Sequence, residues 1–404
     1  DEIKSALGDD LFWRPRHGRI RLQGQWIHFP LKPLDFAVNA PKRFVASVAT
    51  DSALKFLPKR KSNGDTFATV LERGLGPTIC QSFYFPYARK LWGVEPETLD
   101  ATAAHRRVSG SSPLKIIGKV LRQLPGLKAP ASGGFYYPRR GFKQIVEGLK
   151  AVSEQHGAHY ALQTKVIQIH RDSRNGFHLF LEGADGSSVQ EADAIWSTIP
   201  ISALARAIRP AAPDAVLEAA ATIRYRSMIL IYLVVEQGQF TEYDAHYFPE
   251  TAIPISRLSE PKNYSATKEP AGVTVLCAEL PCDIKDDVWA MSDDALGSAS
   301  CAWLASAGLP VRARVKSVAT RRLSHAYPIY DRDFGAKLDL LEAWIESIDG
   351  VVTFGRQGLF AHDNSHHALT MAHAAAQCLR DGGSWDRAAW ARAREAFRHH
   401  VVED

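Results

Sequence analysis

Hydrophobic and polar residues alternate in several short segments, and this pattern predicts β-strands separated by turns. Residues 18–31, "GRIRLQGQWIHFPL", alternate on both sides of a glycine and predict a β-hairpin. Residues 165–172 and 176–183 form a second candidate pair, because the Asn175-Gly176 dipeptide between them is a common hairpin turn. The longest apolar run, "MILIYLVV" at residues 228–235, is far too short to span a bilayer. Further strands are predicted at residues 191–200, 228–236, 245–250, 252–260, 272–280 and 311–323.

A different spacing of apolar residues predicts helices in four places. Residues 112–128 place their leucines on one face and their lysines elsewhere, which fits a core-packed helix or a helix on a membrane surface. Residues 135–157 predict a strand, a turn and a helix ended by Gly157. Two C-terminal helices, at residues 334–348 and 365–381, flank an apolar strand. Strand–helix alternation with an additional antiparallel sheet predicts an α/β enzyme with an inserted substrate domain.

Charge and cysteine content narrow the class of partner. Residues 1–150 hold 25 basic and 12 acidic side chains, a net charge of +13, whereas the remainder holds 24 and 32, a net charge of −8. This asymmetry favours a small anionic substrate or a peripheral contact with an anionic membrane surface. No motif that reads DNA or RNA accompanies the charge, so nucleic acid is not expected. Five cysteines without a CxxC pair, and no signal peptide, predict a cytoplasmic protein.

Residues 355–379, "GRQGLFAHDNSHHALTMAHAAAQCL", contain four histidines and raise two alternatives. A zinc site could use His362, His366 and His373 from one helical face, but the glutamate of the H-E-x-x-H motif is absent. Alternatively, a β-branched strand ends at Gly355, and a helix then begins near Asn364. A strand, a glycine turn and a helix N-terminus form a corner that accepts a phosphate or an electron-rich ring. We therefore expect a cofactor corner and no metal.

The histidine-rich segment resembles the C-terminal flavin-binding segment of the FAD-dependent amine oxidase superfamily. This group includes protoporphyrinogen oxidases and, more distantly, UDP-galactopyranose mutases. Other stretches agree with it in the same order, so the resemblance covers the chain from about Trp13 to Cys378. These stretches are "FYFPYARKLWG", "FYYPRRGFKQIVEGL", "KVIQI", "DAIWSTIP", "PISRLSEPKNY" and "AYPIYDRDF".

The resemblance implies a two-domain flavoprotein with a doubly wound FAD-binding sheet of the GR2 type and a substrate domain of antiparallel sheet and helices. The implied division is residues 1–132 and 206–310 for the substrate domain and residues 133–205 and 311–404 for the FAD-binding domain. The adenine end would meet the backbone at Val166. The implied FAD-binding residues are Val166, Thr198, Gly355, Arg356, Gly358, Asn364, His366 and His367.

One part of the family pattern is missing from the sequence. Such proteins begin with a strand, G-x-G-x-x-G and a helix that together hold the dinucleotide. The nearest stretch here, "GLGPT" at residues 74–78, has the wrong spacing and no predicted strand before it. We therefore expect that the chain lacks the first βαβ unit and binds FAD poorly or not at all.

The resemblance implies two chemistries. In the first, an organic substrate transfers a hydride to flavin N5, as in amine oxidases and protoporphyrinogen oxidases. In the second, a mutase-like isomerase acts on a nucleotide sugar, gripped by a Y-x-x-K-x-W stretch and by arginines. The implied substrate-binding residues are Tyr87, Trp92, Arg106, Arg257, Tyr327 and His362, the last standing where mutases have a tyrosine. A purely structural role is the alternative for these residues. The aromatic residues could be part of the core, Arg106 could lie at a solvated helix end, and Arg257 could form an ion pair with Glu260. The sequence does not identify a catalytic residue or an oligomeric state.

Overall fold

The computed structural model describes residues 2–54, 64–107, 134–172, 176–265, 267 and 269–402. The predicted helix at residues 112–128 lies outside the described residues. Among the described residues, no helix combines the length and the apolar character needed to cross a bilayer.

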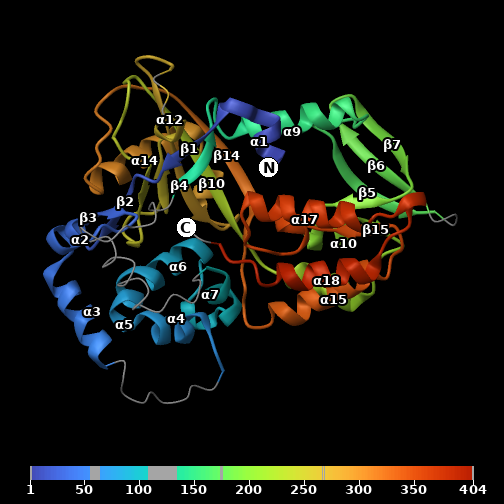
Figure 1. Ribbon diagram of the computed structural model, residues 1–404, viewed down its shortest axis with the longest axis horizontal. Helices are drawn as coiled ribbons and strands as arrows, with labels where there is room; N and C mark the ends of the chain where they lie inside the picture. The colour runs from blue at the N-terminus through green and yellow to red at the C-terminus, as the bar shows by residue number, and fades with distance from the viewer. Residues whose placement is uncertain are drawn as a thin grey trace.

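A seven-stranded sheet occupies one side of the molecule (Figure 1). Its long central strands are antiparallel, and β10 pairs with β13 on one side and with β14 on the other. Alternate residues of β10 and β13 are fully buried and form an apolar core with helix α14 (Asp293–Ser306). In order across the sheet, the strands are β14 (Val315–Pro328), β10 (Tyr225–Val235), β13 (Thr274–Cys282), β12 (Arg257–Ser259), β11 (Ala245–Tyr247), β2 (Gly18–Leu22) and β3 (Gln25–Phe29).

The first hairpin shows how local sequence produces this sheet. Strands β2 and β3 pair antiparallel from Gly18–Phe29 to Leu22–Gln25. The two turn residues have positive φ, +48° at Gln23 and +81° at Gly24, as a tight hairpin turn requires. The hairpin predicted from alternation at residues 18–31 is therefore confirmed. Its buried face packs on helices α2 (Pro33–Asn39) and α3 (Lys42–Leu54).

Three smaller sheets complete the strand content. A four-stranded sheet contains the predicted antiparallel pair of β5 and β6, and β8 and β15 form a short parallel pair. The segment predicted as one strand at residues 191–200 is divided between the end of β7 and β8. The strands of these sheets are β7 (Gly186–Ala192), β6 (Phe177–Gly183), β5 (Lys165–Arg171), β9 (Ile208–Arg209), β8 (Ile195–Ser197), β15 (Val351–Thr353), β1 (Leu11–Pro15) and β4 (Gly134–Pro138).

Helices surround the parallel pair and fill the space beside the large sheet (Figure 1). One core joins α4, α6 and α7 to α10, α11 and α15, and a second core holds α17 and α18 against β15. These helices are α4 (Phe67–Leu75), α6 (Phe85–Trp92), α7 (Ala101–Arg107), α10 (Ile201–Ala207), α11 (Asp214–Thr222), α15 (Phe334–Glu346), α17 (Ser365–Cys378) and α18 (Arg387–Phe397). The remaining helices are α1 (Glu2–Leu7), α5 (Pro77–Ile79), α9 (Lys143–Gln155), α12 (Pro261–Ser265), α13 (Asp287–Ala290) and the single turn α16 (Gly355–Gly358).

Candidate functional site

A glycine turn leaves the end of β15 and leads into α17, as the sequence predicts. Gly355 has a φ of +78°, which favours glycine. A Cβ on Gly358 would lie 2.6 Å from Thr353 Oγ1 and 3.2 Å from Ser197 O. Glycine is therefore required at both positions, once for the backbone and once for space. Thr198 lies beside this turn, since a Cβ on Gly355 would be 3.6 Å from its Cγ2.

Helix α17 begins at Ser365, and its first turn is held by a reciprocal contact. Asn364 occupies the N-cap position, and its backbone N–H donates to His367 Nδ1 over 3.2 Å. Because the helix has 14 residues, its N-terminus carries a partial positive charge. His367 is buried, whereas His366 and His373 are exposed. We call residues 353–367 the corner.

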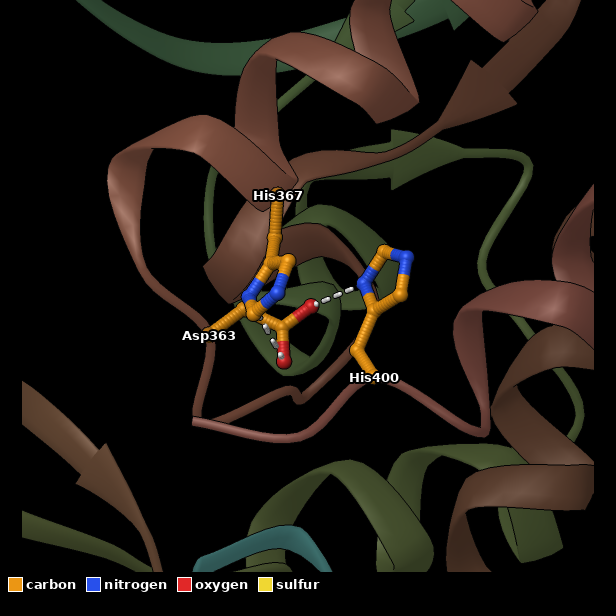
Figure 2. Close-up of side chains that lie close together, drawn as sticks. All are labelled: Asp363, His367 and His400. Atoms are coloured by element: carbon orange, nitrogen blue, oxygen red, sulfur yellow. Dashed lines mark hydrogen bonds and ion pairs between the residues drawn. The ribbon is translucent and has the colours of Figure 1, made fainter. Parts of the chain in front are cut away.

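A buried carboxylate lies immediately before this helix. The side chain of Asp363 is 0% exposed, and His400 Nδ1 lies 2.9 Å from its Oδ2. Arg106 Nη1 is 3.6 Å from Oδ1 of the same carboxylate. Figure 2 shows the two histidines on either side of Asp363, one from α17 and one from the segment after α18. That segment is also tied to α7, because Val402 N–H donates to Arg106 O over 2.8 Å.

Asp363, His367 and His400 are grouped as metal ligands often are, but their contacts compete with a metal ion. The Nδ1 lone pair of His367 already accepts the Asn364 N–H, and the Arg106 cation stands beside Asp363. The two imidazole rings are nearly parallel, 18° apart with centroids 4.4 Å from each other, so their in-plane lone pairs do not converge. Burial lowers the pKa of His367, with further lowering by His366, His400 and Arg106 and an opposing effect of Asp363. These features describe a hydrogen-bonded corner that holds His367 neutral.

An aromatic wall closes one side of the corner. The His362 ring stacks on Tyr327, with centroids 4.5 Å apart, and meets Trp92 edge to face at 6.3 Å. Arg356 also lies over the Tyr327 ring, 5.0 Å from its centroid, and donates to Ala326 O. Buried Tyr330 fixes the backbone, because its hydroxyl donates to Phe360 O and accepts from His362 N–H.

Several buried polar atoms around the corner have no hydrogen-bond partner among the described residues. They are Arg106 Nε and Nη1, Arg356 Nε, Gln357 Oε1 and Asp363 Oδ1. Buried polar groups in proteins are nearly always hydrogen-bonded, so each exception requires an explanation. A polar ligand at the corner would supply partners, and the three guanidinium nitrogens suit oxygen atoms of a phosphate or a ring carbonyl.

The half-buried face of the large sheet carries a second set of charged residues. Arg257 on β12 pairs across the sheet with Glu279 on β13. The alternative predicted from the sequence, an ion pair between Arg257 and Glu260, is wrong. Glu260 instead accepts hydrogen bonds from Phe240 N–H and Thr241 N–H. The Glu279 carboxylate raises the pKa of Arg257, and nearby tyrosines, including Tyr327, act in the same direction.

The structure brings most of the residues implied by the resemblance to the corner and places others elsewhere. Gly355, Gly358, Asn364 and His366 belong to the corner itself, and Thr198 lies beside its turn. Side-chain contacts at the corner join Trp92, Arg106, Tyr327, Arg356, His362 and His367. Val166 is exposed on β5, and Tyr87 stacks on Phe83 at 5.9 Å. Burial lowers the pKa of Lys90 to about 7, while its ammonium donates to Phe248 O, Glu250 O and Ile255 O, so it anchors α6 to a loop.

Three residues of the site were not identified from the sequence. Asp363 stands four residues before His367, and this i, i+4 spacing at the start of a helix could have identified it. Glu279 and His400 carry no local signal, because tertiary contacts alone bring them to their partners. Tyr330, expected only to cap a strand, instead fixes the backbone of the corner. "GLGPT" spans the end of α4 and the start of α5, so the element directly before it is a helix.

No family model and no curated protein matches this sequence. Solved structures do match its fold. A reduced UDP-galactopyranose mutase aligns with a TM-score of 0.76 at 18% identity, over 98% of this chain and 83% of its own. A protoporphyrinogen oxidase-like protein from an Exiguobacterium species aligns with a TM-score of 0.65 at 18% identity, over 88% and 79%. Cyclohexylamine oxidase from Brevibacterium oxydans aligns with a TM-score of 0.57 at 16% identity, over 98% and 84%. The chain therefore shares its fold with these three proteins, among them a mutase and a protoporphyrinogen oxidase-like protein, the groups that its sequence motifs resemble.

Proposed function

We propose that this chain is an FAD-dependent oxidoreductase and that the corner holds the flavin end of FAD. The observation that carries the proposal is the group of buried polar atoms at the corner that make no hydrogen bond, Arg106 Nη1 and Asp363 Oδ1 being in ion-pair contact only. These atoms surround a glycine turn and the N-terminus of a 14-residue helix. Arg106 and Arg356 would donate to flavin or phosphate oxygens, and the start of α17 would stabilise negative charge on them.

The residues implied by the resemblance would bind different parts of FAD. Thr198 and Gly355 would lie along the nucleotide, beside the close packing that Gly358 permits. The backbone at Val166 would meet the adenine end, and Asn364, His366 and His367 would face the flavin. Neutral His367 is suited to donate a hydrogen bond through its Nε2, since its Nδ1 is an acceptor.

When bound, the flavin would accept a hydride from a small organic substrate. The residues of this chain would orient that substrate and exclude water. His362 is 4% exposed, and its stack on Tyr327 forms a rigid apolar wall suited to a ring or an alkyl chain. The names of two similar structures, a protoporphyrinogen oxidase-like protein and cyclohexylamine oxidase, agree with this class of reaction.

A mutase-like isomerase is the second candidate. The similarity to the reduced UDP-galactopyranose mutase favours it, because that alignment has a TM-score of 0.76 and covers 98% of this chain. Such a reaction would place a diphosphate near Arg257.

Titration of FAD into the chain, followed by flavin fluorescence, tests the proposal. Because the sequence has no G-x-G-x-x-G unit, we expect weak but saturable binding, which Arg106→Gln weakens about tenfold further, the loss expected for one charge-assisted hydrogen bond. Arg332→Gln is the matched control, because Arg332 is exposed. Equal FAD affinity in Arg106→Gln and the wild type, or no saturable binding, would contradict the proposal.

The two chemistries are then separated on the FAD-loaded protein. An oxidoreductase bleaches its visible flavin spectrum when an oxidisable amine or a porphyrinogen is added without oxygen. A mutase shows no such bleaching, and after reduction with dithionite it interconverts the pyranose and furanose forms of UDP-galactose.

A further inference from the structure

Arg257 and Glu279 stand opposite each other on adjacent antiparallel strands and form a close ion pair. Glu279 Oε1 accepts from Arg257 Nε over 2.9 Å and from Arg257 Nη2. Glu279 is 13% exposed and Arg257 is 37% exposed, so part of the Arg257 side chain lies open to solvent. A single carboxylate oxygen therefore takes up two of the three guanidinium nitrogens.

Both side chains of this pair point to the same face of the large sheet. The neighbouring residues Leu258 and Ala278 are buried in the opposite apolar core, so Arg257 and Glu279 point to the other face. Tyr327 connects the two places, because it stacks on His362 and also interacts electrostatically with Arg257. A substrate bound at the corner would extend toward this pair.

At this position the charge of Arg257 is balanced by Glu279. Tyr247 and Tyr264 also lie close enough to Arg257 to affect its pKa. Arg321, a further cation, faces the same side of the sheet and interacts with Tyr232, as Glu279 also does. An anion that approached Arg257 would meet the Glu279 carboxylate already within hydrogen-bonding distance, and like charges there oppose binding.

We propose that Glu279 is a specificity-determining residue: by holding Arg257, it rejects diphosphates and selects substrates with a net-neutral polar group at this position. The pair uses Nε and Nη2 of Arg257 and Oε1 of Glu279, so Nη1 of the same guanidinium is a further donor and Oε2 of the same carboxylate a further acceptor. A neutral polar group or a zwitterion satisfies both, whereas a diphosphate satisfies only the arginine. The inference rests on the proposed function only in placing the substrate over this face.

Isothermal titration of UDP into the wild type and into Glu279→Gln tests this assignment. Glutamine keeps the shape of the side chain and removes its charge, so Arg257 and Arg321 are left without a counter-charge. We expect Glu279→Gln to bind UDP at least about tenfold more tightly than the wild type, a gain of about 1.4 kcal/mol. The gain should disappear in the double variant Arg257→Gln/Glu279→Gln.

The control is Glu182→Gln, which removes the same charge from an exposed position on β6 and should not change UDP binding. Unchanged UDP affinity in folded Glu279→Gln, or a gain that persists without Arg257, overturns the assignment. The wild type gives a test that needs no variant. If the wild type binds UDP more than about tenfold more tightly than uridine, the diphosphate contributes to binding. That result would also overturn the role assigned to Glu279.

The outcome is separable from that of the flavin titration. Gain of UDP binding in Glu279→Gln with no FAD binding would remove the proposed function and leave the role of Glu279 intact. FAD binding together with tight UDP binding in the wild type would support a flavin-dependent function and remove the role of Glu279. It would also favour the mutase reaction.

Discussion

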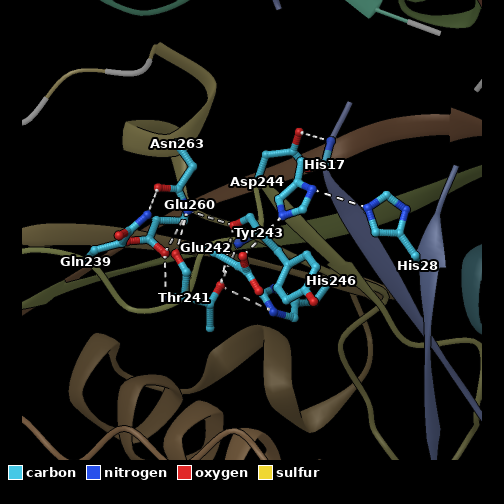
Figure 3. Close-up of polar contacts among 10 residues, drawn as sticks. All are labelled: His17, His28, Gln239, Thr241, Glu242, Tyr243, Asp244, His246, Glu260 and Asn263. Atoms are coloured by element: carbon cyan, nitrogen blue, oxygen red, sulfur yellow. Dashed lines mark hydrogen bonds and ion pairs between the residues drawn. The ribbon is translucent and has the colours of Figure 1, made fainter. Parts of the chain in front are cut away.

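Two histidine-containing polar clusters in this molecule look alike in composition and differ in how completely their groups are paired. One is the corner with Asp363, His367 and His400 (Figure 2). The other lies at the edge of the large sheet, around β11, and includes His17, His28 and His246 (Figure 3). None of the ten residues drawn in Figure 3 has a buried side-chain atom without a hydrogen bond, although Arg19 beside Tyr243 has one; at the corner the carboxylate of Asp363 itself has such an atom, as does its neighbour Arg106.

The sheet cluster is satisfied by short contacts within itself. Glu260 accepts from Phe240 N–H at 2.8 Å, from Thr241 N–H at 3.0 Å and from Thr274 Oγ1 at 2.7 Å. The backbone of His17 donates to Asp244, and the His17 and His28 rings join through their nitrogens over 3.2 Å. A histidine count therefore does not identify a ligand site. The corner differs in that buried atoms without a hydrogen bond occur there on a carboxylate, an amide and two guanidinium groups together, whereas beside the sheet cluster they occur on guanidinium groups alone.

The largest effect that would test this contrast is expected from Glu260→Ala. Glu260 is 1% exposed, and its removal leaves buried donors without an acceptor. We expect the free energy of unfolding to fall by about 3 kcal/mol, measured by urea denaturation. FAD affinity should not change. Glu182→Gln serves as the exposed control, and a loss below about 0.5 kcal/mol in Glu260→Ala would refute the structural role.

The pH dependence of stability gives the next effect. Burial, and then the charge of Arg19, lowers the pKa of His246 to about 3. The unfolded chain takes up this proton near pH 6.5, so it binds more protons than the folded chain between pH 6.5 and pH 3. Stability from neutral His246 is complete above pH 6.5 and falls by up to about 1.4 kcal/mol per unit as the pH drops.

Comparison with His246→Gln isolates this contribution, because glutamine does not titrate. Urea denaturation between pH 7 and pH 5 should show a shallower loss of stability in the variant. Identical slopes would mean that His246 is protonated in the folded protein, and the sheet cluster would then be less tightly paired than described.

The smallest effect is expected from added metal. The contacts of His367 and Asp363 compete with a metal ion, so Zn²⁺ should raise the melting temperature by less than about 1 °C at concentrations where a built site would add several kcal/mol. His400→Gln should respond to Zn²⁺ as the wild type does. If the wild type binds Zn²⁺ stoichiometrically and His400→Gln does not, the corner is a metal site.

Local patterns predicted much of this structure. Alternation and turn residues identified the hairpin of β2 and β3, the antiparallel pair of β5 and β6, and the long strands β10, β13 and β14. The strand, glycine turn and helix at the corner followed from Gly355, Gly358 and the polar N-cap, because each of these requirements is local.

The rest depends on contacts between distant segments. Helix α18 was not predicted, although Asp386 caps its start by accepting from Ala389 N–H. His400 lies 37 residues from Asp363, and Glu279 lies 22 residues from Arg257. No spacing rule connects such pairs, since the sheet register and the path of the chain after α18 bring them together.

The parallel pairing of β2 with β11 has a consequence for biosynthesis. Gly18 lies beside Ala245, and His17 bonds to Asp244 across 227 residues of sequence. At about 5 to 20 residues per second, a ribosome needs roughly 10 to 45 seconds to make that interval. During this time the hairpin of β2 and β3 has only its local helices α2 and α3 to cover it, and the edge of β2 that later pairs with β11 is open to any other nascent chain. Aggregation during expression should therefore begin at this hairpin, and slower elongation should increase it.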